Sequence, residues 1–387
     1  MYLSDLVSAL EGSATAEVFA VAKKLEKQGY KVYHLEIGQP DFPPPKPVLN
    51  EICWAAQNGK TTYTPSKGIP ELLDAIISYT KDITNTEIDE SELISISGAK
   101  HGIFSSLFAV LNPGDEVLIP DPCWVSYFTL VKSIRAKPVF LNLDSPEFDL
   151  DLEKVKSKIS DKTKAIIINS PNNPTGSIYS YDTLKGLIEL AMDNDFYVIS
   201  DEIYWEYSFR KEPHSILEFP EWREKGIIIN GFSKTFSMTG LRLGWVIANQ
   251  SIIDQVNKIV QFTTSCPPSV SQYAGIKAID NIEIARKTIK EKLPPRIELV
   301  EKMINECDKV FLSPIHGAMY AFIKLGDGNI DDKKFTTDLL TEKKIAVTPG
   351  SAFGPAGKGH VRISLGVQYE TLELALKQFL EFVKSTI

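Results

Sequence analysis

Seven short apolar runs recur between residues 93 and 250, and segments of helix length separate most of them. Apolar strands that alternate with helices indicate a mostly parallel sheet that is covered on both faces. The pattern therefore predicts an α/β fold in which a seven-stranded sheet binds its ligands beyond the carboxyl ends of the strands. We expect these strands at 93–96, 117–119, 139–141, 165–168, 197–199, 227–229 and 245–247.

Beyond about residue 290 the sequence pattern changes, and the predicted helices become longer and more charged. Near the other end, residues 14–28 have the apolar spacing of an amphipathic helix. We expect residues 45–290 to form a large domain, and residues 1–44 together with 291–387 to form a smaller α+β domain. Strands of the small domain are expected near 310–311, 320–323 and 361–364.

The composition is that of an ordinary globular protein, with 43% hydrophobic and 24% charged residues in a chain of 387. A formal net charge of −8 argues against nucleic-acid and membrane partners, because those require a basic face. The four cysteines lie far apart and away from any histidine cluster, so neither a metal site nor a redox motif is predicted. With no signal-peptide pattern and no apolar run of membrane-spanning length, we expect a cytoplasmic protein.

Three clusters of turn-forming and polar residues follow predicted strands. Residues 97–102 form either a tight turn or a phosphate cradle at the start of a helix. Residues 169–176 bring two amides to the edge of the sheet, where Asn173 can donate a hydrogen bond to a ligand oxygen. The run 197–199 leads to Asp201, which is either a helix cap or a buried carboxylate that needs a cation.

A fourth cluster, residues 231–244, follows the apolar run 227–229 and contains Lys234. This lysine is either a solvated loop cation or an amine beside an anion site formed by Ser233 and Arg242, as a Schiff-base lysine next to a phosphate requires. A lysine, a carboxylate for a ring nitrogen, an amide and a tyrosine for a ring hydroxyl, and a phosphate turn together describe pyridoxal phosphate. No single element is specific, but the set in this order is.

On these residues the chain resembles the class I aminotransferases, pyridoxal-phosphate enzymes of fold type I. The resemblance covers nearly the whole chain, and its strongest segments are 173–176, 200–204 and 233–244. It implies an enzyme that moves an amino group between an L-amino acid and a 2-oxo acid with ping-pong kinetics. It also implies a homodimer with active sites at the subunit interface.

The resemblance implies a role for each residue of the cofactor site. Lys234 forms the Schiff base and moves a proton as base and then acid, and Asp201 pairs with the pyridine nitrogen. Tyr204, which we count with Lys234 and Asp201 as catalytic, bonds the ring oxygen together with Asn173, while Trp124 stacks on the ring. The implied phosphate site consists of Gly98, Ala99, Lys100, Ser233, Arg242 and Tyr63 of the partner subunit.

The resemblance also implies how the substrate is bound. Arg362 grips the α-carboxylate as a bidentate fork, with help from Gly38. Ser13, Thr15 and Lys100 match positions that touch the distal carboxylate of acidic substrates in bacterial aspartate aminotransferases, although they also suit two helix caps and a solvated lysine. The implied substrate-binding residues are Gly38, Trp124, Asn173, Arg362, Thr15 and Lys100.

We therefore expect an aminotransferase that favours aspartate and 2-oxoglutarate. Residues 264–267 and the loop 350–354 also resemble archaeal aromatic aminotransferases, so an aromatic or broad-specificity enzyme is one alternative. A β-lyase or synthase of the same fold is another.

Overall fold

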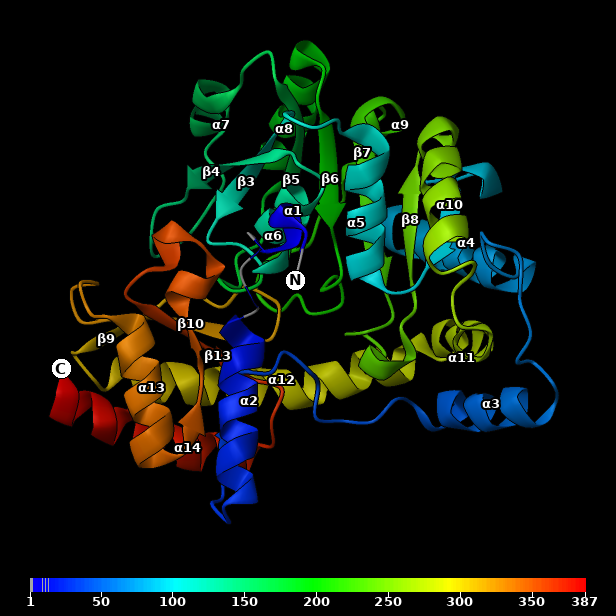
Figure 1. The fold of residues 1–387 in the computed structure, drawn as a ribbon. Coiled ribbons are helices and arrows are strands. Elements are labelled where there is room, and N and C mark those ends of the chain that lie inside the picture. The colour runs from blue at the N-terminus through cyan, green and yellow to red at the C-terminus, as the bar shows by residue number, and fades with distance from the viewer. Residues whose placement is uncertain (1–2, 9, 11, 13) are drawn as a thin grey trace.

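The computed structural model describes residues 3–8, 10, 12 and 14–387 (Figure 1). Its large layer is a sheet of seven strands: β2 (Leu93–Ile96), β3 (Glu116–Asp121), β4 (Lys137–Asn142), β5 (Thr163–Asn169), β6 (Tyr197–Asp201), β7 (Gly226–Gly231) and β8 (Gly244–Ala248). The strand order is β2-β8-β7-β6-β5-β3-β4. Strand β8 runs antiparallel to β2 and β7, and the pairs from β7 to β4 are parallel. The mostly parallel sheet expected from the apolar runs is thus confirmed.

Both faces of this sheet are buried. Successive residues of a strand point to opposite sides of the sheet, and the side chains on each side belong to an apolar core. In β5, Ile166 and Ile168 belong to one apolar core, whereas Ala165 and Ile167 belong to the other. The first core includes side chains of α4 (Pro70–Thr84), α8 (Tyr181–Asn194) and α11 (Ser269–Asp280). The second includes side chains of α5 (Ala99–Val110), α6 (Ser126–Ser133) and α10 (Gln250–Thr263).

A smaller antiparallel sheet has the order β12-β13-β10-β9. Its strands are β9 (Val310–Leu312), β10 (Tyr320–Leu325), β12 (Thr348–Pro349) and β13 (His360–Ser364). A third core joins this sheet to α12 (Ile282–Asn305), α13 (Asp332–Lys343) and α14 (Tyr369–Thr386). The three strands expected in this part of the sequence are therefore present.

The N-terminal segment packs against the C-terminal part of the chain. Strand β1 (Tyr33–His34) pairs in parallel with β11 (Ile345–Ala346), and Leu35 lies in the third core. Helix α2 (Ala14–Lys27) matches the expected amphipathic helix and contacts β11 and β12. This packing brings residues near 36 next to β13, more than 300 positions further along the chain.

The expected division into residues 45–290 and residues 1–44 with 291–387 stays a prediction. Helix α12 runs across the expected boundary and contributes to both regions, since Ala285 belongs to a core of the large sheet and Ile289 to the core of the small sheet. The remaining described helices are α1 (Asp5–Ser8), α3 (Lys46–Gln57), α7 (Leu152–Lys158) and α9 (Trp222–Lys225). Among the described residues, no helix has both the length and the hydropathy that a membrane crossing needs.

Candidate functional site

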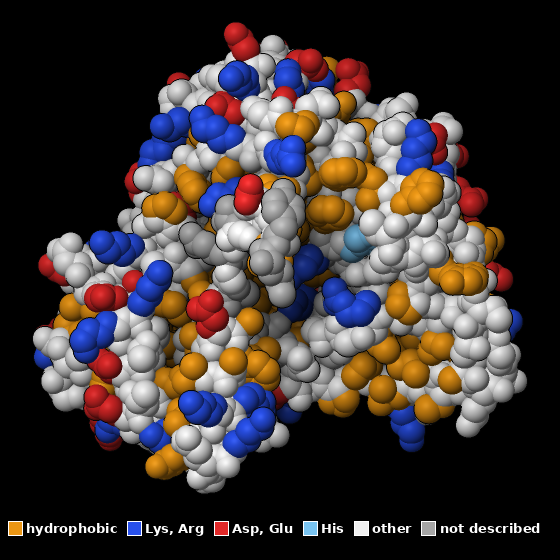
Figure 2. Space-filling model, viewed as in Figure 1, with side chains coloured by type: hydrophobic (Ala, Val, Ile, Leu, Met, Phe, Trp, Pro, Cys, Tyr) orange, Lys and Arg blue, Asp and Glu red, His pale blue; other side chains and the backbone are white. Residues whose placement is uncertain are grey.

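A cavity of about 360 Å³ lies where the carboxyl ends of β5 and β6 face strands β10 and β13 of the small sheet. Figure 2 shows the surface hollowed between the two parts of the molecule, with lysine and arginine side chains inside the hollow. The cavity gathers side chains from along the whole chain. Of the residues expected from the sequence, it is lined by Thr15, Gly38, Ala99, Lys100, Trp124, Asn173, Asp201, Tyr204, Ser233, Lys234, Arg242 and Arg362.

Lys234 follows β7 and points into the cavity, where its Nζ donates a hydrogen bond to the carbonyl oxygen of Gly38. The ammonium lies 5.8 Å from the centre of the Tyr204 ring. Burial lowers the pKa of Lys234, and the positive charges of Arg362 and Arg242 lower it further, against the influence of Tyr320 and Asp201. With a lowered pKa, more of the amine is present near neutral pH as the free base, the form that can act as a nucleophile or accept a proton.

Asp201 ends β6 and is 3% exposed. Its Oδ2 accepts a hydrogen bond from the Tyr127 hydroxyl at 2.7 Å, and its Oδ1 accepts one from the backbone N–H of Ile203 at 3.3 Å. Burial raises the pKa of Asp201 to about 6, although Tyr127, Ile203 and Lys234 act in the opposite direction. A cationic nitrogen held at this carboxylate would lower the pKa again, because an opposite charge favours the ionised form.

Two neighbouring asparagines connect this carboxylate to the other side of the cavity. The Asn169 amide donates to the carbonyl oxygen of Asp201 at 2.8 Å, and its Oδ1 accepts from the backbone N–H of Asn173 at 2.8 Å. The Oδ1 of Asn173 accepts in turn from Arg362 Nη1 at 2.9 Å. The loop after β5 therefore fixes Asp201 and Arg362 relative to each other.

Arg362 lies in β13 and is 3% exposed. Its guanidinium lies between two rings, 4.4 Å from the centre of Tyr320 and 4.9 Å from that of Phe353. The Tyr320 hydroxyl also lies 2.6 Å from the hydroxyl of Tyr204. Among the described residues, Nε of Arg362 has no hydrogen-bond partner, so this buried cation retains a donor for an anionic ligand.

Gly98 and Arg242 form a close contact at the start of α5. Gly98 has a φ of 86°, and a Cβ built on it would lie 2.6 Å from Arg242 Nη2. Arg242 also has a positive φ, of 52°, and its Nη1 donates to the Thr239 carbonyl oxygen at 2.8 Å. A glycine is needed here because a side chain would displace the guanidinium from the N-terminus of the helix. A helix N-terminus with an adjacent arginine and Ser233 makes a site for a phosphate group.

Lys100 and Thr15 lie at a more open part of the cavity. The ammonium of Lys100 lies 4.9 Å over the ring of Trp124, although the side chain as a whole is exposed. Partial burial lowers the pKa of Lys100, and the like charges of Arg242 and Lys234 lower it further. Thr15 belongs to the first turn of α2. Ser13, which we expected beside it, lies outside the described residues.

Tyr63 differs from the other expected residues, because it is 86% exposed and does not line the cavity of its own chain. Three residues that hydrogen-bond to the expected site residues were not given a role from the sequence: Tyr127, Tyr320 and Asn169. Asn169 belongs to the predicted turn cluster 169–176, whereas the two tyrosines lie in ordinary apolar stretches. Their partners Asp201 and Tyr204 are 74 and 116 positions away, so no local pattern reveals these contacts.

Taken together, the cavity offers a phosphate site, a buried carboxylate for a cationic ring nitrogen, a buried amine and a buried arginine. The first three suit a phosphorylated aromatic cofactor with a reactive carbonyl group, and the arginine suits the carboxylate of a second ligand. The donors come from both sheets, so a bound ligand would contact both parts of the chain.

Residues 30–379 match the protein family described as aminotransferase class I and II. A (5-formylfuran-3-yl)methyl phosphate transaminase of Methanocaldococcus jannaschii is 39% identical over 98% of this chain and 99% of its own length. An aspartate aminotransferase of Thermotoga maritima is 39% identical over 99% of this chain and 100% of its own. The structure of Thermus thermophilus aspartate aminotransferase with maleate has a TM-score of 0.93 at 33% identity, over 99% of this chain and 100% of that one.

Proposed function

The chain belongs to the class I and II aminotransferases, which use pyridoxal phosphate to exchange amino groups between amino acids and 2-oxo acids, and we propose that its preferred pair is aspartate and 2-oxoglutarate. One observation carries the choice of an acidic donor. Lys100 and Thr15 line the same cavity as Arg362, so a dicarboxylate has a cationic partner at each end. The relatives named as aspartate aminotransferases support the same choice.

In this proposal the start of α5 would hold the phosphate of the cofactor, and Asp201 would face its ring nitrogen. The phosphate would be bound by Gly98, Ala99 and Lys100 through backbone N–H groups and by the side chains of Ser233 and Arg242. Tyr63 of the partner subunit completes this phosphate site.

The other proposed cofactor contacts are those that the resemblance implies, and their residues line the cavity together with Asp201. Asp201 would hold the ring nitrogen in its protonated form, Asn173 and Tyr204 would bond the ring oxygen, and Trp124 would cover the ring. When bound, the cofactor supplies an electron sink for the pair that remains when a bond to the substrate Cα breaks.

Lys234 is the proposed proton carrier. It takes the proton from the substrate Cα as a base and later gives it up as an acid, which a lowered pKa favours near neutral pH. The hydrogen bond from Tyr127 favours the ionised form of Asp201, which would supply the negative charge that the cationic ring nitrogen needs. Arg362 and Gly38 orient the α-carboxylate, and Lys100 binds the distal carboxylate.

An aromatic or broad donor range is the second candidate. Trp124, Tyr204 and Tyr320 line the cavity and suit an apolar side chain as well as a cofactor ring. The lyase alternative has no comparable support, because the relatives reported above are transaminases.

The test is a panel of amino donors with 2-oxoglutarate as the acceptor. We expect a higher kcat/KM with aspartate than with phenylalanine or alanine. A preference for phenylalanine would replace the proposal with the aromatic alternative. Aspartate without an acceptor should yield one oxo acid per active site and no ammonia, whereas continued release of ammonia would indicate a lyase.

We also propose a cytoplasmic homodimer. The exposure of Tyr63 supports the dimer, since this side chain is free to reach a second subunit. Among the described residues the four cysteines are unpaired, and Cys123 and Cys307 are buried, which suits a reducing compartment. Light scattering at micromolar concentration should give twice the mass of 43.1 kDa. A monomer with full activity would contradict the shared phosphate site.

A further inference from the structure

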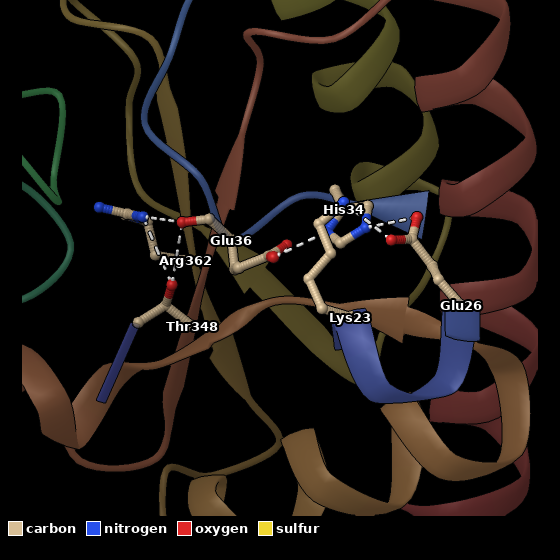
Figure 3. Close-up of polar contacts among 6 residues, drawn as sticks. All are labelled: Lys23, Glu26, His34, Glu36, Thr348 and Arg362. Atoms are coloured by element: carbon tan, nitrogen blue, oxygen red, sulfur yellow. Dashed lines mark hydrogen bonds and ion pairs between the residues drawn. The ribbon is translucent and has the colours of Figure 1, made fainter. Parts of the chain in front are cut away.

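A chain of polar contacts connects the surface of α2 to Arg362 (Figure 3). Lys23 Nζ donates to Glu26 Oε2 at 2.8 Å, and Glu26 Oε1 lies 3.0 Å from His34 Nε2. On the other side of the ring, His34 Nδ1 lies 2.8 Å from Glu36 Oε1. The backbone oxygen of Glu36 accepts a hydrogen bond from Arg362 Nη2 at 2.5 Å. Glu36 thus contacts the histidine through its side chain and the arginine through its backbone.

The surroundings of His34 favour its charged form. Each ring nitrogen faces a carboxylate oxygen, and an ionised carboxylate only accepts hydrogen bonds. Both contacts are satisfied at once only when both nitrogens carry a proton, which makes the ring an imidazolium. The hydrogen bond to Glu36 raises the pKa of His34 most, burial opposes it, and Glu26 raises the pKa further.

Glu36 depends on this imidazolium, because its side chain is 0% exposed. Among the described residues its Oε2 has no hydrogen-bond partner. A buried carboxylate without a cationic partner is costly. Arg362 responds to the same charge: burial lowers the pKa of Arg362, while Tyr320, Tyr204 and the negative charge of Glu36 raise it.

The other charged groups around His34 belong to α2 and to the residue before β11. Lys23 of α2 is bound to Glu26 and faces the solvent, with 50% of its side chain exposed. Lys344 precedes β11, but its ammonium lies 4.5 Å over the ring of Tyr30. Glu36 and Glu26 are therefore the charged groups that lose a cationic partner when His34 gives up its proton.

We propose that His34 is a positioning residue that controls how strongly Arg362 binds the α-carboxylate of the substrate. Protonated His34 neutralises Glu36, so the charge of Arg362 is available to the substrate. When His34 is neutral, the buried charge of Glu36 competes with the substrate for Arg362. This inference rests on the proposed role of Arg362 in substrate binding.

The way in which KM changes with pH follows from the raised pKa of His34. The imidazolium persists above the ordinary pKa of about 6.5 and is lost as pH rises through the pKa of His34 in the folded protein. We expect KM for the amino donor to rise about fivefold across that transition, a typical coupling between two sites. The value of kcat should change less, because His34 does not contact the reacting atoms.

Two substitutions separate this role from packing. Glu36→Gln removes the competing charge, so KM should stay at the low wild-type value at every pH. His34→Gln removes the neutralising charge, so KM should stay at the high value. A purely structural role would raise KM in both variants, and that result would overturn the inference.

A second measurement uses the wild-type protein, so its outcome does not depend on whether a variant folds. The pKa of His34 in the wild-type holoenzyme is measured by NMR with and without succinate, an unreactive dicarboxylate. Because coupling is reciprocal, succinate should raise this pKa by about 0.7 pH units, the logarithm of a fivefold change. His214 is the matched control, since it is as buried as His34 but has a single carboxylate partner, Glu218 at 3.2 Å. The ring signals of His214 should not respond to succinate, and His214→Gln should keep the wild-type KM profile.

The outcomes separate this inference from the proposed function. If Arg362→Lys weakens succinate binding and the pKa of His34 does not respond to succinate, the inference is wrong and the proposed function stands. If succinate binds Arg362→Lys as tightly as wild type, the proposed role of Arg362 is wrong and the inference falls with it.

Discussion

The buried and open parts of the cavity differ in how firmly the fold holds their side chains. Asn173, Asp201 and Arg362 are at most 4% exposed, and each forms a hydrogen bond with a residue of another element of the chain. Lys100 and Thr15 lie at the open part, where Lys100 is exposed and lies over the ring of Trp124. The fold therefore specifies the groups for the chemistry closely, and leaves the choice of substrate to a few long or peripheral side chains.

Lys234→Ala tests the buried part of the cavity, and of the proposed substitutions it should have the largest effect on activity. The variant should lose about 10²- to 10⁴-fold in kcat with every donor, because the proton carrier is removed. Initial rates with aspartate and with phenylalanine measure the loss. Lys302→Ala, on the surface of α12, is the control and should behave as wild type. Activity within tenfold of wild type would remove Lys234 from the mechanism.

Arg362→Lys should lower kcat/KM about 100-fold for aspartate and phenylalanine alike. Both donors share the α-carboxylate, and an ammonium cannot reproduce the bidentate fork. The control is Arg210→Lys, because Arg210 forms a two-pronged pair with Glu301 at the surface. A loss confined to one donor would mean that Arg362 contacts the substrate side chain instead of the α-carboxylate. The buried part of the cavity would then also contribute to the choice of substrate.

Tyr127→Phe should lower kcat/KM about tenfold at pH 6 and less at pH 8. The Tyr127 hydroxyl lowers the pKa of Asp201, so its removal raises that pKa and moves the acid limb of the pH profile upward. Tyr79→Phe is the matched control, since Tyr79 is also buried and donates to a carboxylate, Glu206, at 2.9 Å. A profile that stays in place would mean that Tyr127 only packs.

Glu202→Gln should have the smallest effect on activity and should act on stability instead. Glu202 adjoins Asp201 but is bonded to Ser200 and Ser215, each at 2.9 Å, and burial raises its pKa to about 8. Because the folded protein binds this proton more tightly than the unfolded chain, wild-type stability falls as pH rises from about 4.5 to about 8.

The variant lacks this titration and should gain on wild type by up to about 1.4 kcal/mol per pH unit in that window. Denaturant unfolding at pH 5, 7 and 8 measures the difference. Parallel stability curves for the two proteins would show that Glu202 does not titrate as described.

Much of the fold follows from the sequence, because strands buried on both faces read as continuous apolar runs. The expected residues Asn173, Asp201 and Lys234 follow such runs and line one cavity. The roles of Tyr127 and Tyr320 were out of reach, since each depends on a partner that only the tertiary packing brings near. Only the structure shows why a glycine is needed in the turn before α5, namely the close approach of Arg242 to Gly98.

The expected helix 14–28 and the strands of the small sheet are found for the same reason, since their apolar spacing reflects one buried face. Substrate choice follows less directly from the sequence. It depends on where long side chains such as Lys100 place their charge, and no periodicity encodes that position.

The proposed preference for an acidic donor can be tested by the ratio of kcat/KM for aspartate to that for phenylalanine, measured in wild type and in Lys100→Ala. We expect a ratio above one in wild type that falls about tenfold in the variant, because one charged contact to the substrate is lost, with the value for phenylalanine unchanged. A wild-type ratio below one would rule out the preference for aspartate, and a ratio that Lys100→Ala leaves unchanged would rule out the proposed role of Lys100.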